Sequence, residues 1–147
     1  HGFTRFTALE RGQTGTPRRL VERMLSKLEQ SPDAVLQDFW TRAEECETPL
    51  HSHFSMGETN LDRLREDLHG MINLDLTKKL AQLPTSQFLA VISPRDQIVS
   101  PELSADTFPP SRLQAVNAPH SGPLANPKVY TAIVALALKN ATAPSAH

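Results

Sequence analysis

Cysteine, net charge and long apolar runs are all scarce in this sequence. Cys46 is its one cysteine, so an internal disulfide is excluded and a reducing compartment, the cytoplasm, is expected. No apolar run approaches the roughly 18 residues that a membrane span requires. The formal net charge of −1 argues against nucleic acid as a main partner. The 147 residues, 39% of them hydrophobic, fit one globular domain with neither nucleic acid nor membrane as an expected partner.

Residues able to bind a metal are sparse as well. Of the six histidines, His51 and His53 form the close pair, and the carboxylates near them are Glu47 and Glu58. A structural zinc site needs four such ligands at suitable spacing. We therefore expect a surface loop at 50–57, with no metal and no other cofactor.

Two strand-like stretches end in loops that carry an ionisable residue. Residues 88–92 are an apolar run of strand length, and Pro94 ends it because proline cannot donate to a sheet. Asp96 follows. Residues 112–117 alternate polar with apolar, and His120 lies just beyond them. Strands joined by a short helical crossover are parallel neighbours whose carboxyl ends share one edge, so Asp96 and His120 are expected at the same edge. Each residue also has a simpler interpretation. Asp96 could do no more than cap a turn, and His120 could be a solvated loop histidine.

The residues around this pair resemble the C-terminal half of the α/β-hydrolase family. That family has a loop like Gly-x-x-Asp-x-Ile-Val-Pro after one strand, Gly-His after the next, and an Asn-Pro or His-Pro pair that opens the final helix. Here the corresponding stretches are Ser-Pro-Arg-Asp-Gln-Ile-Val-Ser-Pro at 93–101, Ala-Pro-His at 118–120 and Asn-Pro at 126–127. Ser93 and Pro119 replace two glycines of the pattern, which alters loop backbone but removes no reactive group. The resemblance covers residues 74–139.

The resemblance implies a catalytic triad with Asp96 as the acid and His120 as the base. In the family the serine precedes both, in a Gly-x-Ser-x-Gly elbow between a strand and a helix. No such elbow occurs here, and Ser55 is not the nucleophile, because His53 stands where the first glycine is needed. We therefore expect a fragment that is inactive alone and whose partner is the N-terminal half of the same hydrolase.

Helical spacing dominates the first half of the chain. Thr16-Pro17 signals a helix start, with Leu20 on its apolar face, and Ser31-Pro32 and Asn60 signal two more. No strand is expected between Thr16 and Met71. The predicted fold is the C-terminal part of an α/β-hydrolase: a helical lid, then two parallel strands with flanking helices. Its parts are a connection from the core at 1–15, the lid at 16–73, the strand–helix units at 74–139 and a frayed tail at 140–147.

The predicted lid carries two further candidate sites. Phe39 and Trp40 either only pack the helices together or also line a substrate channel, since a lid turns apolar residues toward the active site. Arg19, Arg23 and Lys27, spaced at i, i+4 and i+8, form a basic ridge. The ridge is either a solvated face or a docking site for an acidic acyl carrier protein.

In this chain the lid comes first, then the acid, then the base. The same order is found in the carboxylesterase group that includes the pimeloyl-acyl-carrier-protein methyl ester esterase of biotin synthesis, so the chain is similar to that group. This similarity implies a serine hydrolase of carboxylic esters, with a small-molecule or carrier-bound ester, such as an acyl methyl ester, as substrate. Two alternatives stay open. An upstream aspartate as nucleophile would favour dehalogenase-like chemistry, and no nucleophile would favour a non-catalytic hydrolase-like interaction module.

Overall fold

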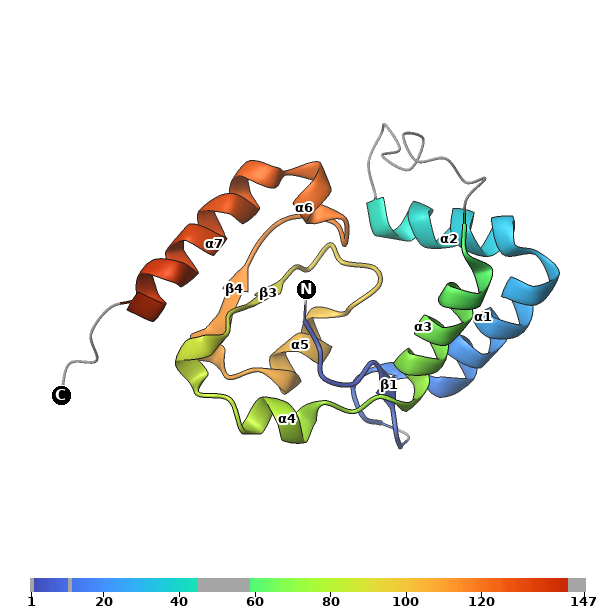
Figure 1. Ribbon diagram of the computed structural model, residues 1–147, viewed down its shortest axis with the longest axis horizontal. Coiled ribbons are helices and arrows are strands. Elements are labelled where there is room, and N and C mark those ends of the chain that lie inside the picture. Colours follow the sequence, from blue (N-terminus) through green and yellow to red (C-terminus); the bar gives the residue numbers. More distant parts are fainter. Residues whose placement is uncertain (1, 11, 45–58, 143–147) are drawn as a thin grey trace.

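The computed structural model describes residues 2–10, 12–44 and 59–142. Three helices lie on one side of the molecule, a pair of short strands lies in the middle, and a long helix lies on the other side (Figure 1). The three helices are α1 (Arg18–Gln30), α2 (Pro32–Glu44) and α3 (Leu61–Asn73). The strands are β3 (Ala90–Ile92) and β4 (Leu113–Ala115), and the long helix is α7 (Pro127–Thr142).

Helix α1 is the centre of the helical layer, because it packs against both α2 and α3. Val21 and Leu28 are its buried residues. Leu20, predicted on the apolar face of this helix, is 44% exposed. Helix α3 starts as predicted: the side chain of Asn60 accepts a hydrogen bond from the N–H of Arg63 at 2.9 Å.

The first helix begins one residue later than predicted, because Pro17, expected as its first residue, is its N-cap. Thr16–Pro17 forms strand β2, which pairs in parallel with β1 (Thr7–Ala8), and helix α1 begins only at Arg18. Gly15, with φ at 120°, directs the chain into this strand, and the N–H of Thr16 bonds the carbonyl of Phe6 at 2.9 Å. The expectation of no strand between Thr16 and Met71 was wrong as well, because β2 pairs with β1. Helix-capping signals are local and carry no information about such a pairing.

Strands β3 and β4 are parallel neighbours, as predicted, with Ala90 opposite Leu113 and Ile92 opposite Ala115. The crossover between them contains helix α5 (Pro101–Thr107) and the 3₁₀ turn η4 (Pro110–Arg112). Each strand has three residues, so both are shorter than predicted. The start of the second predicted strand is taken up by η4. In the described part of the chain, β3 pairs on one edge only.

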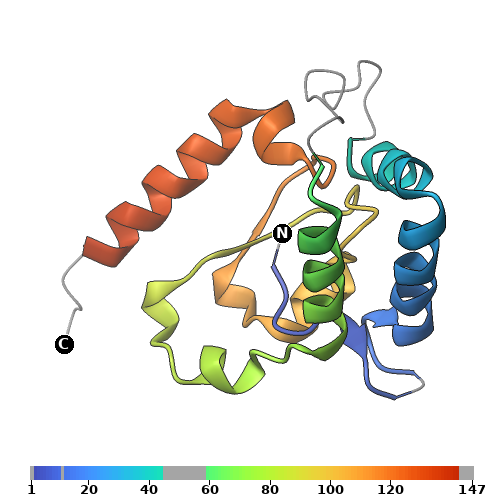
Figure 2. The same cartoon turned by 45° about the vertical axis from the view of Figure 1, so that its right-hand side comes forward.

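The hydrophobic core joins the helical layer to helix α5 and to the loop that follows β3. It consists of Phe6, Val21, Ile72, Val99 and Leu103. These residues come from the residue before β1, from α1, α3 and α5, and from the loop after β3. Helices α1 and α3, which are in contact, run side by side in Figure 2. Val99 is only 2% exposed, so the loop that follows β3 is anchored in the core and does not hang free.

The C-terminal part continues with two helices. The short helix α6 (Gly122–Ala125) follows β4, and α7 begins at Pro127 as the Asn-Pro signal predicts. Helix α7 runs to Thr142, so the tail predicted from 140 begins inside it. A further helical turn, α4 (Thr77–Ala81), and the 3₁₀ turn η3 (Thr85–Gln87) lead into β3. Among the described helices, none has the length and apolar character to cross a membrane.

Candidate active site

The loop after β3 holds the carboxylate of Asp96 in a fixed position. Its Oδ1 accepts hydrogen bonds from the backbone N–H groups of Ile98 and Val99, both at 2.8 Å. The side chain of Asp96 is 0% exposed. Because buried carboxylates need such partners, these two bonds explain how the chain tolerates a charge at the edge of its core.

The loop after β4 brings His120 to the same place. Its Nδ1 lies 2.9 Å from Oδ2 of Asp96, so the predicted approach of the two side chains is confirmed as geometry. An ionised carboxylate can only accept, so Nδ1 donates and the neutral ring keeps Nε2, on its opposite edge, as a proton acceptor. The side chain of His120 is 29% exposed. The pair therefore consists of a buried carboxylate and a partly exposed imidazole.

Two opposing effects set the pKa of Asp96. Burial raises it, while the hydrogen bonds from His120, Val99 and Ile98 lower it, and their combined effect is a pKa below the ordinary value. Asp96 is therefore ionised at neutral pH. A buried anion in contact with Nδ1 fixes the imidazole tautomer and stabilises the positive charge that the ring gains on protonation.

Ser93 joins the two loops. Its hydroxyl donates to the carbonyl oxygen of Ala118 at 2.5 Å and accepts from the N–H groups of Ala118 and Arg95, at 3.3 and 3.1 Å. Ser93 is 1% exposed. In the sequence this residue was noted only as a replacement for glycine. Ser93 can link the two loops only because β3 pairs with β4. No local feature of the sequence predicts this link.

Helix α2 reaches the pair through Phe39. The rings of Phe39 and His120 meet edge to face, with centroids 6.4 Å apart and an interplanar angle of 79°. Trp40 packs against Phe39 at 5.6 Å. The backbone N–H of Ser121 bonds the carbonyl of Ala43 at 2.8 Å, which ties the histidine loop to the same helix. A role of Phe39 and Trp40 in binding substrate stays a prediction.

Tyr130 of α7 packs against the loop that carries His120 and was not identified from the sequence. Burial, and then the charge of Asp96, raise the pKa of its phenol. The phenol packs so closely on Gly122 that a Cβ there would collide with it. Gly122 follows His120 by two positions, so this contact packs α7 against the loop that carries His120. A lone tyrosine in a helix gives no sequence signal for such a role.

The remaining predicted sites are not brought to this pair. Arg19, Arg23 and Lys27 are exposed on α1 and make no ion pair with the described residues, whereas Arg18 pairs with Glu22 at 2.8 Å. Within the described residues, no three His, Cys, Asp or Glu side chains are grouped to hold a metal. The expected surface loop at 50–57 lies outside the described residues, and so do these sequence candidates: Cys46, Glu47, His51, His53, Ser55 and Glu58.

Comparison with known proteins identifies the fold. No protein-family model matches the chain, and no curated protein sequence matches it. Its structure is similar to that of an esterase (EaEST) from Exiguobacterium antarcticum, with a TM-score of 0.78 and 17% identity, over 92% of this chain and 53% of the esterase. The likeness shows an α/β-hydrolase fold. The chain spans about half the length of that esterase.

Proposed function

We propose that this chain is the part of a serine hydrolase that supplies the acid and the base for cleavage of a carboxylic ester. The observation that carries the proposal is the contact of 2.9 Å between Asp96 and His120, placed after two parallel strands. The fold likeness to an esterase supports the same reaction class. A dehalogenase would share this pair but requires an aspartate as nucleophile.

The geometry suits the steps of acyl transfer. Nε2 of His120 takes the proton of a serine hydroxyl as the serine oxygen attacks the ester carbonyl. Asp96 stabilises the resulting imidazolium. The imidazolium then gives its proton to the departing alkoxide as the ester C–O bond breaks, which leaves an acyl-enzyme. Water, deprotonated by the same nitrogen, releases the carboxylic acid and restores the serine.

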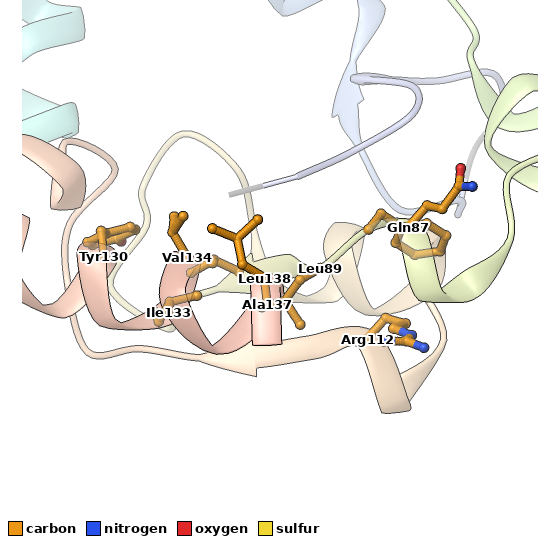
Figure 3. Close-up of a pocket in the computed structure, with 10 residues that line it drawn as sticks. Gln87, Leu89, Arg112, Tyr130, Ile133, Val134, Ala137 and Leu138 are labelled. Atoms are coloured by element: carbon orange, nitrogen blue, oxygen red, sulfur yellow. The ribbon is translucent and has the colours of Figure 1, made fainter. Parts of the chain in front are cut away.

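The serine and the oxyanion donors would come from the other half of the fold. An apolar groove of about 310 Å³ between β3 and α7 supports docking of that half (Figure 3). Its lining includes Leu89, Val91, Ile133 and Val134, of which Val134 is 57% exposed. Exposed apolar surface of this kind is typical of an interface. The groove lies beside β3, whose second edge pairs with no described strand.

We also propose a carrier-bound acyl ester, such as a methyl ester, as the substrate, with the basic ridge of Arg19, Arg23 and Lys27 as the docking surface for an acidic carrier protein. The ridge is exposed and carries three positive charges along one side of α1. Such a surface accelerates encounter with an acidic partner.

The test compares the 147-residue chain with the full-length protein that joins it to the missing half. A fluorophosphonate probe, which reacts only with an activated serine, should label the full-length protein at a serine outside this chain. The chain alone should show neither labelling nor hydrolysis of p-nitrophenyl acetate. A full-length protein that is folded but unlabelled and inactive would contradict the proposal and favour a non-catalytic interaction module.

A further inference from the structure

His120 lies inside a tight turn that Gly122 closes. The backbone N–H of Gly122 donates to the carbonyl oxygen of Pro119 at 2.9 Å. This bond makes His120 and Ser121 the two central residues of the turn. Ser121, with φ −73° and ψ 14°, has the geometry of the third residue of a type I turn. A displacement of Gly122 therefore moves the backbone that carries the imidazole.

The phenol of Tyr130, on helix α7 (Figure 3), explains why the closing residue of the turn is glycine. Gly122 does not have a positive φ, so its backbone conformation does not require glycine. A Cβ at this position would, however, lie 2.8 Å from Cζ of Tyr130 and closer still to its hydroxyl, an approach that real Cβ atoms do not make. The absence of a side chain at Gly122 therefore leaves room for the phenol, against which the turn rests.

The turn is held at three points. Ser93 bonds the backbone of Ala118 at its start. The N–H of Ser121 bonds a carbonyl of helix α2 at 2.8 Å in its middle. Tyr130 packs against Gly122 at its end. The first two points are hydrogen bonds of the loop itself, so the phenol is the contact by which α7 reaches the turn.

Tyr130 is also close enough to the acid to feel its charge. Burial, and then the charge of Asp96, raise the pKa of the phenol, which therefore stays neutral at neutral pH. A neutral phenol packs against the turn without placing a second negative charge beside the buried carboxylate.

We propose that Tyr130 is a positioning residue for the base: by packing against Gly122 it holds the 119–122 turn and so keeps the imidazole of His120 directed toward Asp96. The inference rests on the proposed ester hydrolysis. Tyr130 acts through the turn and binds no part of the substrate, so its loss should lower kcat and leave KM nearly unchanged. Because misplacing a catalytic group by about 1 Å can cost roughly 10²-fold in rate, we expect a loss of about ten- to a hundredfold.

The first experiment measures kcat and KM of the full-length protein on p-nitrophenyl acetate. Tyr130→Ala should show the loss in kcat, and Tyr130→Phe, which keeps the ring, should retain most of the rate. The matched control is Leu136→Ala, which removes a 47% exposed side chain from the same helix and should keep the wild-type kcat. Unfolding curves set a temperature at which each variant is folded, and Tyr130→Leu replaces Tyr130→Ala if the latter does not fold. A wild-type kcat in the folded variant would overturn the proposal.

The second experiment tests the contact itself by a double-mutant cycle. Gly122→Ala puts a Cβ against the phenol and should lower kcat, whereas the same change in the Tyr130→Ala background should cost little because the phenol is gone. The control is Gly70→Ala, in α3, where nothing lies within 4 Å of the added Cβ and the wild-type rate is expected. An equal cost of Gly122→Ala in both backgrounds would overturn the contact as the means by which Tyr130 acts.

The third measurement does not depend on catalysis. The proton resonance of the Nδ1–H of His120 reports its contact with Asp96. It should broaden or shift in Tyr130→Ala and stay unchanged in Leu136→Ala. An unchanged resonance in Tyr130→Ala would overturn the positioning of the imidazole, even if kcat fell. Loss of every hydrolytic activity in the wild type would overturn the proposed function instead, and the resonance alone would then decide whether Tyr130 positions the ring.

Discussion

The hydroxyl of Ser93 bonds both backbone groups of Ala118, at 2.5 Å to the carbonyl oxygen and 3.3 Å to the N–H. Ser93 begins the loop that carries Asp96, and Ala118 begins the loop that carries His120. One buried side chain therefore sets the distance between the two loops. We therefore expect this link to contribute to the alignment of Asp96 with His120.

Ser93→Ala should consequently weaken both folding and the pair. It leaves buried backbone groups of Ala118 without their partner, at about 1–3 kcal/mol each in the free energy of unfolding. Urea denaturation measures this loss. The matched control is Ser104→Ala, which removes another 1% exposed hydroxyl, bonded to the carbonyl of Gly2 at 2.6 Å. Only Ser93→Ala should also broaden or shift the proton resonance of the Nδ1–H of His120. Identical spectra for the two variants would mean that Ser93 has a structural role only.

Asp96→Asn should remove most of the activity of the full-length protein while keeping its fold. The amide oxygen can still accept from Ile98 and Val99, but the amide nitrogen would donate to Nδ1 of His120 and move the ring proton to Nε2. The base is then blocked, a change that costs roughly 10⁴-fold in kcat in Ser-His-Asp enzymes. Steady-state kinetics on p-nitrophenyl acetate measure the loss. Activity within tenfold of the wild type would exclude Asp96 as the residue that orients the base.

The lowered pKa of Asp96 predicts a specific dependence of stability on pH. The ordinary pKa is 3.8, and the folded protein has a lower one. The stabilisation is therefore complete above 3.8 and is lost as the pH falls through the lower, folded value. The difference in unfolding free energy between wild type and Asp96→Asn should shrink on acidification below 3.8. Urea titrations at a series of pH values test this, and a constant difference would show that the ionised carboxylate does not stabilise the fold.

The basic ridge makes a prediction about substrate choice. Arg19→Glu with Arg23→Glu should lower kcat/KM for a carrier-bound ester far more than for p-nitrophenyl acetate, because only the large acidic substrate is attracted over long range. The effect should diminish at high salt. The control is Lys78→Glu with Lys79→Glu, which reverses two exposed charges on α4. Equal losses on both substrates would instead indicate damage to the helical layer.

The sequence was sufficient to locate Asp96 and His120, because each residue follows a strand-like stretch whose end is marked by a nearby proline, Pro94 or Pro119. Their contact could be expected since the two strands are parallel neighbours. The short strand at Thr16–Pro17 was misread because its pairing with Thr7–Ala8 is not a local property. Contacts that depend on tertiary packing, such as Tyr130 against Gly122, leave no trace in spacing or composition.

The most direct test of the central claim is the hydrolysis rate of His120→Ala in the full-length protein, set against His69→Ala. His69 is an exposed histidine of α3 and serves as the control. Because His120→Ala also takes the Nδ1 donor away from the buried carboxylate of Asp96, it should lower the Tm as well, so the rates are compared at a temperature where each variant is folded. We predict that His120→Ala loses hydrolysis of p-nitrophenyl acetate, by more than Asp96→Ala does, while His69→Ala keeps the wild-type rate. A folded His120→Ala protein that still hydrolyses the ester at the wild-type rate would contradict the role of His120 as the base.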